Sequence, residues 1–86
     1  KKQKVFVFTE LYGNDSDTGV NVLGVYATKS MAKGMWAYKK QEVLESYEQA
    51  FSGEYEVSED HPTLFEITLK NEYIWEQLLI TEKEVE

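Results

Sequence analysis

The sequence predicts an α+β fold, in which four strands in the chain order ββαββ form a mostly antiparallel sheet with one long helix on one face. Three observations support this prediction. Two β-rich segments flank a turn near the start, a long segment with helical periodicity follows, and two more β-rich segments come at the end. With 86 residues, the chain is expected to form a single domain, residues 1–86, around one small core.

The first two strands are expected at Lys4–Tyr12 and Val20–Thr28, which are rich in β-branched and aromatic residues. The segment between them, GNDSDTG, holds glycine, asparagine and aspartate, which accept turn conformations and bond their own backbone amides. An EF-hand loop needs oxygen donors at positions 1, 3 and 5 and a glutamate at position 12. Counted from Asp15, a glycine stands at position 5 and a tyrosine at position 12. We therefore expect a hairpin turn rather than a calcium site.

Thr28–Phe51 is expected to be the helix, with Thr28 as its N-cap and a stop at Ser52-Gly53. At 100° per residue, its apolar side chains gather on one side. This stripe consists of Ala32, Trp36, Val43, Tyr47 and Ala50. Lys39 and Lys40 interrupt it, and their aliphatic stems are expected along the edge of the core while the ammonium groups reach water.

The third strand is expected at Leu64–Lys70, where apolar and polar residues alternate, and the fourth at Tyr73–Thr81. Between helix and third strand, Tyr55–Glu59 could form a short extra edge strand before a turn at Asp60-His61-Pro62. The tail Glu82–Glu86 is expected to fray. A right-handed crossover through the helix favours the sheet order 2-1-3-4, with the third strand beside the first.

The segments Lys4–Thr9 (KVFVFT) and Val22–Thr28 (VLGVYAT), with Ala32 on the helix and a last strand holding Trp75 and Ile80–Glu82 (ITE), form a pattern. It resembles short uncharacterised ββαββ proteins encoded by bacteria and their phages, a domain of unknown function. The resemblance spans most of the chain. It implies the fold described above and a cytoplasmic setting, and it brings no catalytic residue and no established activity.

The residue types present exclude several kinds of chemistry. The chain has no cysteine, and its only histidine, His61, falls in an expected turn. No nucleophile elbow, phosphate-binding loop or dinucleotide fingerprint occurs. We therefore expect no enzyme activity, no catalytic residue, no cofactor and no metal site. No apolar run approaches membrane-spanning length, so we expect no membrane partner and a cytoplasmic location.

Charge is distributed unevenly along this acidic chain, whose net charge is −7. All 9 positive charges are lysines, and a chain without arginine is a poor candidate for binding nucleic acid. The residues through Ala50 carry a net charge of +1 and those after it −8. Glu82, Glu84 and Glu86 alternate along the tail. This pattern supports one alternative function, an acidic phage-type inhibitor or nucleic-acid-mimicking decoy that binds a basic host protein.

The preferred function follows from how much of the sheet one helix can cover. Val5–Phe8 (VFVF) and the last strand carry apolar residues on both faces, so some of them must lie on the face without a helix. The tail or residues 52–63 could fold over that face, or the strand boundaries could differ. We favour an interface, and hence a small non-catalytic protein–protein interaction module that forms a homodimer.

The residues expected at that interface are Phe6, Phe8, Tyr73, Trp75 and Leu79. The sequence leaves open which side of the first strand packs on the helix.

Overall fold

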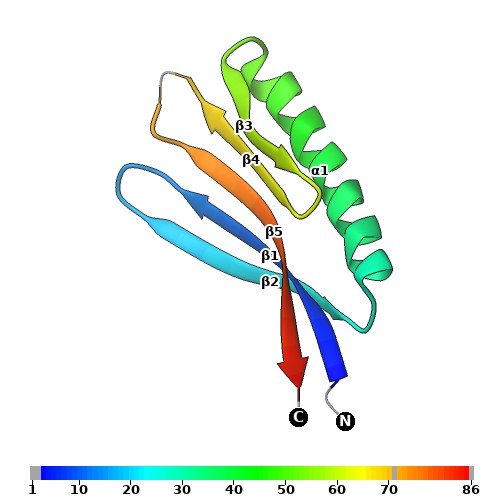
Figure 1. Ribbon diagram of the computed structural model, residues 1–86. Coiled ribbons are helices and arrows are strands. Elements are labelled where there is room, and N and C mark those ends of the chain that lie inside the picture. The colour runs from blue at the N-terminus through cyan, green and yellow to red at the C-terminus, as the bar shows by residue number, and fades with distance from the viewer. Residues whose placement is uncertain (1–2, 71, 86) are drawn as a thin grey trace.

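A computed structural model describes residues 3–70 and 72–85. Five strands and one helix follow each other in the order ββαβββ (Figure 1). Their bounds are β1 Gln3–Gly13, β2 Thr18–Tyr26, α1 Lys29–Phe51, β3 Tyr55–His61, β4 Leu64–Leu69 and β5 Trp75–Val85.

The strands form one antiparallel sheet in the order β2-β1-β5-β4-β3. β1 and β5 are the central pair, and β2 and β3 are the two edges. The helix α1 begins beside the end of β2 and ends beside the start of β3, so it crosses one face of the sheet from edge to edge (Figure 1). The α+β class is therefore as the sequence predicts.

The prediction of a four-stranded ββαββ sheet is wrong, because the polar segment after the helix forms a full strand. β3 pairs with β4 through six residue pairs from Tyr55–Leu69 to His61–Leu64. The segment has few apolar residues because it lies at an edge, where both faces and one side meet water. The expected turn at residues 60–62 accordingly starts two residues later than predicted.

The predicted sheet order 2-1-3-4 is also wrong, since the last strand rather than the third lies beside β1. The β1–β5 ladder runs from Gln3–Val85 to Gly13–Trp75 without a break. β1 and β5 carry apolar residues on both faces, and that composition suits the middle of a sheet. The tail expected to fray is part of this ladder as far as Val85, and Glu82 there forms an ion pair with Lys4, with 3.2 Å between Nζ and Oε2.

The turn between β1 and β2 is organised by one side chain, as its composition predicts. The Asn14 carboxamide oxygen accepts hydrogen bonds from the backbone amides of Ser16 and Asp17, both at 3.0 Å. The backbone amide of Asn14 in turn donates a hydrogen bond to the backbone carbonyl of Asp17 at 2.9 Å. These bonds satisfy the turn backbone within the turn itself.

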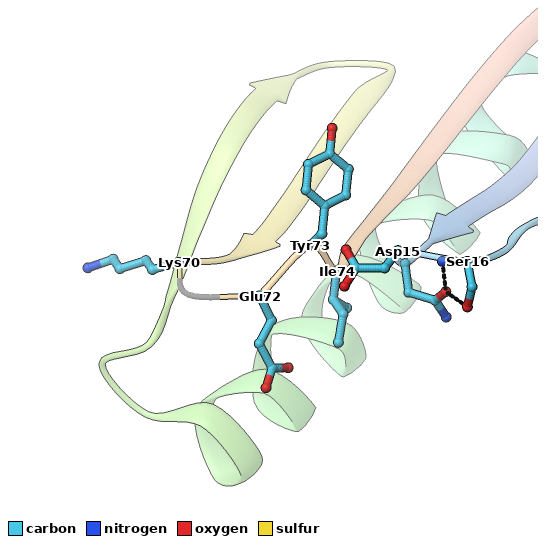
Figure 2. A pocket seen from close by; sticks show the side chains of 7 residues that line it. Asp15, Ser16, Lys70, Glu72, Tyr73 and Ile74 are labelled. Carbon is cyan, nitrogen blue, oxygen red and sulfur yellow. Dashed lines mark hydrogen bonds between the residues drawn. The ribbon is translucent and has the colours of Figure 1, made fainter.

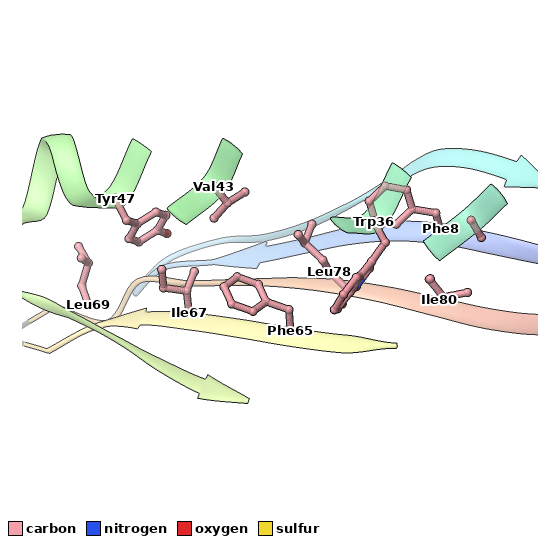
Figure 3. Packing of buried hydrophobic residues seen from close by; sticks show 10 residues of the cluster. Phe8, Trp36, Val43, Tyr47, Phe65, Ile67, Leu69, Leu78 and Ile80 are labelled. Atoms are coloured by element: carbon pink, nitrogen blue, oxygen red, sulfur yellow. The ribbon is translucent and has the colours of Figure 1, made fainter. Parts of the chain in front are cut away.

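The core lies between α1 and the sheet (Figure 3). Phe65 and Ile67 on β4 and Leu78 on β5 are almost completely buried. From the helix, the predicted stripe contributes Ala32, Trp36, Val43 and Tyr47. Ala50, also expected in the stripe, is exposed, and Phe51 packs against the core in its place.

Polar contacts cap the start of the helix and join its middle to the edge of the sheet. The Thr28 hydroxyl accepts a hydrogen bond from the Met31 amide at 3.2 Å, which confirms the predicted N-cap. The Lys40 ammonium lies 5.3 Å from the ring centroids of Trp36 and Phe65 and 2.6 Å from an Asp60 carboxylate oxygen. The lysine stem therefore follows the core edge, as predicted, and its charged end joins the helix to β3.

Within the described part of the chain, α1 is not long and apolar enough to cross a membrane.

Candidate functional site: the open face of the sheet

The helix divides the sheet into a covered face and a second face, called here the open face. Along β1, Phe8 is buried under the helix, so Val7 and Thr9 point the opposite way. The same alternation on β5 buries Leu78 and Ile80 and places Leu79 on the open face. The cross-strand register then assigns every paired residue to one face or the other.

Four strands contribute apolar side chains to the open face, and β2, β1 and β5 supply most of them. These residues are Val20, Val22 and Val25 of β2, Val5, Val7 and Leu11 of β1, Trp75 and Leu79 of β5, and Leu64 of β4. The three valines of β2 are 58–63% exposed, and the other six are half-buried by their neighbours. Among residues 3–70 and 72–85, no helix or strand lies over them (Figure 1).

Cross-strand pairing arranges these side chains in rows. One row runs Val22–Thr9–Leu79–Leu64 across four strands, because Thr9 pairs with Val22 and Leu79, and Leu79 with Leu64. The adjacent row begins with Val20 and Leu11 and ends in polar residues of β5 and β4. The apolar surface is therefore continuous from the β2 edge to the middle of the sheet.

The part of the open face that β4 and β3 form is polar. Glu66 of β4 accepts hydrogen bonds from the Ser58 hydroxyl and the Gln77 carboxamide, both at 2.7 Å. On the edge strand β3, the His61 ring nitrogen Nε2 lies 2.6 Å from a Glu59 carboxylate oxygen. An apolar area with a polar rim on one side has the composition of a protein interface.

Trp75 covers one end of the open face. It pairs with Gly13 of β1, and a Cβ atom on that glycine would stand 2.6 Å from the indole ring. The ring therefore lies flat against the β1 backbone, in space that only glycine leaves free. A broad, half-buried aromatic side chain held in one orientation is the type of residue that dominates binding energy at interfaces.

The residues expected at the interface fall in three places. Trp75 and Leu79 lie on the open face. Phe8 is buried beneath α1 and Phe6 packs against the same core. Tyr73 is 72% exposed in the connection between β4 and β5.

Sequence reasoning did not assign the β2 valines and Leu11 to the open face. The alternation of β1 alone cannot decide which side meets the helix, since both sides are apolar. A signal was present in the aromatic rings, because Phe6 and Phe8 are larger than Val5 and Val7 and fill a two-layer core better.

A polar depression of about 840 Å³ lies between the β1–β2 turn and the β4–β5 connection (Figure 2). Its lining includes Asp15, Lys70, Glu72 and Tyr73. The Lys70, Glu72 and Tyr73 side chains point in different directions rather than toward a common point (Figure 2). A binding site for a small ligand needs convergent polar groups, so this depression is a weak candidate.

A second group of polar residues lies at the covered face, where Glu10 of β1 and Glu76 of β5 meet Tyr47 and Lys39 of α1. Burial and the neighbouring Glu10 carboxylate raise the pKa of Glu76 to about 7. Burial, with the negative charge of Glu76, raises the pKa of the Tyr47 hydroxyl to about 12. These residues do not line the depression described above. Their position between helix and sheet points to an effect on stability rather than on a bound substrate.

The acidic tail residues do not form a free acidic surface. Glu82 pairs with Lys4, Glu84 lies on the same side of β5, and Glu86 is outside the described residues. In residues 3–70 and 72–85, no group of three or more histidine, aspartate or glutamate side chains is placed to hold a metal ion.

Comparison of the chain with protein-family models, curated proteins and solved structures gives no match. The resemblance to short bacterial and phage proteins therefore stays a prediction. For this chain the geometry of the open face is the principal guide to function.

Proposed function

We propose that this protein is a small, non-catalytic protein–protein interaction module that pairs with a second copy through its open face. One observation carries the proposal: nine apolar side chains form a continuous surface on the side of the sheet opposite α1. Contiguous exposed apolar surface marks association sites on water-exposed proteins. The proposal includes the cytoplasmic location that the sequence predicts.

The dimensions of the molecule suit an interface of ordinary size. It extends 49 × 25 × 17 Å, and the open face is one of its broad sides. Each partner in a standard interface contributes about 800 Å² of surface. A two-fold pair would bury the same surface on both copies, so an apolar, nearly uncharged area such as the one around Val22 and Leu79 suits self-association.

The central experiment measures molar mass by light scattering after gel filtration. We expect at least twice the chain mass of 10.0 kDa. Leu79→Lys places a charge on the open face and is expected to halve the mass of the assembly.

Tyr38→Lys is the matched control. Tyr38 is 68% exposed on the outer side of α1, away from both faces of the sheet. This variant should keep the wild-type mass. A wild-type mass of 10.0 kDa at every concentration, or an equal loss of mass in the control, would contradict the proposal.

Salt dependence separates this proposal from the acidic-decoy alternative. Two copies each carry a net charge of −7, so their repulsion is screened by salt and self-association should tighten as salt increases. Binding of an acidic decoy to a basic partner should instead weaken with salt.

A further inference from the structure

The two edges of the sheet differ in their protection against pairing with another strand. β2 pairs with β1 on one side, and no described strand lies on its other side (Figure 1). Its nine residues, TGVNVLGVY, contain no charge and no proline. Natural edge strands usually carry a charge or a proline, because their outer amides and carbonyls offer a template for a further strand.

β3 at the other edge has that protection. Its seven residues, YEVSEDH, include the charged side chains Glu56, Glu59 and Asp60. Two copies that met through β3 would bring these acidic side chains together. Only the β2 edge is therefore suited to strand addition.

β2 contains a β-bulge, because Leu23 has no partner in the ladder with β1. Thr18–Val22 and Gly24–Tyr26 pair regularly with β1 on either side of it. An incoming strand would thus meet two extended segments separated by the bulge.

Charge at the two ends of β2 identifies the partner as a second copy in antiparallel orientation. Asp15 and Asp17 precede β2, and Lys29 and Lys33 follow it on the first turns of α1; all four are exposed. In an antiparallel pair centred on Val22, the extra residue Leu23 shifts the register, so that Asn21, Val20 and Gly19 lie opposite Gly24, Val25 and Tyr26 of the second copy. The acidic residues before β2 then lie at the same end of the pair as Lys29 of the second copy, and the reciprocal contact forms by symmetry. Parallel pairing would set like charges together.

We propose that β2 pairs with β2 of a second copy, antiparallel and about a two-fold axis through Val22, to give one continuous sheet of ten strands. This axis is perpendicular to the sheet, so both helices lie on one side and both open faces on the other. The β2 valines of the two copies then extend a single apolar surface. The inference is independent of the face-to-face pairing, since it rests on the edge and its flanking charges.

The first test uses the Leu79→Lys background, in which pairing through the open face is disabled. Leu79→Lys alone should still form a dimer of twice 10.0 kDa at high concentration, through the β2 edge. Adding Asn21→Lys should give a monomer. Asn21 is exposed and pairs with Glu10, so the new lysine lies off the open face and close to its symmetry mate across the axis.

The control for this test is Glu56→Lys in the same background, which changes a charge on the protected edge and should leave the mass unchanged. A Leu79→Lys protein that is monomeric at all concentrations would overturn the edge proposal and leave the open-face proposal intact. A wild-type assembly that keeps its mass with Leu79→Lys but is split by Asn21→Lys would contradict the open-face proposal and support the edge proposal.

The second test exchanges the flanking charges, again with Leu79→Lys. Asp15→Lys and Lys29→Asp should each weaken self-association by about tenfold, because each dimer then contains two like-charge contacts. Mixing the two variants should restore association as a heterodimer, in which both contacts join opposite charges. Native mass spectrometry measures the heterodimer fraction. A mixture that associates no better than its separate components would contradict antiparallel edge pairing.

Discussion

The two faces of the sheet are made by the same strands and yet differ sharply in how far their apolar side chains are exposed. On the covered face, Phe65, Ile67 and Leu78 are 0–1% exposed and meet the apolar stripe of α1. On the open face, Val20 and Val22 are more than 60% exposed. One helix supplies enough apolar surface for one face only, so folding free energy comes mainly from the covered side. The apolar surface on the open side is the basis of the proposed intermolecular contacts.

The largest effect that would test this comparison is the loss of a core ring. Phe65→Ala should lower the free energy of unfolding by about 3–5 kcal/mol, through lost burial and the cavity left behind. Val22→Ala, on the open face, should change it by less than about 0.5 kcal/mol. Urea denaturation at low protein concentration measures both. If Phe65→Ala fails to fold, Ile67→Val offers a smaller loss of about 1 kcal/mol at the same site. Equal losses of unfolding free energy in Phe65→Ala and Val22→Ala would contradict the view that the covered face provides most of the stability.

The two tryptophans sharpen the comparison, since one lies on each face. The Trp36 indole nitrogen donates a 3.0 Å hydrogen bond to the Leu78 carbonyl inside the core. Trp36→Phe should therefore cost about 1–3 kcal/mol. Trp75→Phe removes no hydrogen bond that the structure shows, and it should weaken association more than folding. Thermal melts and light scattering on both variants separate these effects.

The Glu76 carboxyl, whose pKa is raised by burial and by Glu10, gives the covered face a pH dependence. Its folded-state pKa of about 7 lies above the ordinary 4.5, so the folded protein favours the protonated form. This contribution is complete below pH 4.5 and is lost as the pH rises toward and through 7. Glu10 opposes ionisation of Glu76, while Lys39 and the Tyr47 hydroxyl favour it.

Allowing for partial exposure of Glu76, we expect a loss of about 1 kcal/mol between pH 5 and pH 8. Glu76→Gln should remove most of this slope. Urea titrations at a series of pH values measure it, and an unchanged slope in the variant would assign the dependence to other groups.

The smallest effect is expected on the outer side of the helix, which belongs to neither face. Gly34 lies on α1, and a Cβ atom added there would meet nothing within 4 Å. Gly34→Ala should raise stability by about 0.5–1 kcal/mol, because alanine has the higher helix propensity and restricts the unfolded chain. The mass of the assembly should not change. A lower free energy of unfolding in Gly34→Ala would show that the added methyl group is not exposed to solvent as the structure indicates.

Local signals in the sequence predict the helix, its Thr28 cap, the first hairpin and the alternation of β4, because each depends on residues near one another in the chain. The sheet order depends on distant pairs. The polar β3 could be read as loop or as edge strand, and five strands result only because β4 offers it a partner. β1 and β5 carry apolar residues on both faces, and this pattern indicates that the two strands lie next to each other in the middle of the sheet.

The candidate site was predictable in kind but only partly in residues. Trp75 and Leu79 followed from the composition of the last strand, whereas Phe6 and Phe8 proved to lie on the covered side. The sequence shows that the nine residues of β2 carry no charge. That β2 is an edge strand becomes known only from the strand order of the sheet.

The central position of β5 in the sheet also affects how the chain folds. Its ladder joins Leu11 to Gln77 and Gln3 to Val85, so the middle of the sheet closes through contacts between distant parts of the chain. Such long loops are slow to close. Until β5 is in place, the inner sides of β1 and β4 have no neighbour, and the last strand of another copy can pair there instead. Strand exchange between unfinished copies is thus the misfolding route that this topology leads us to expect.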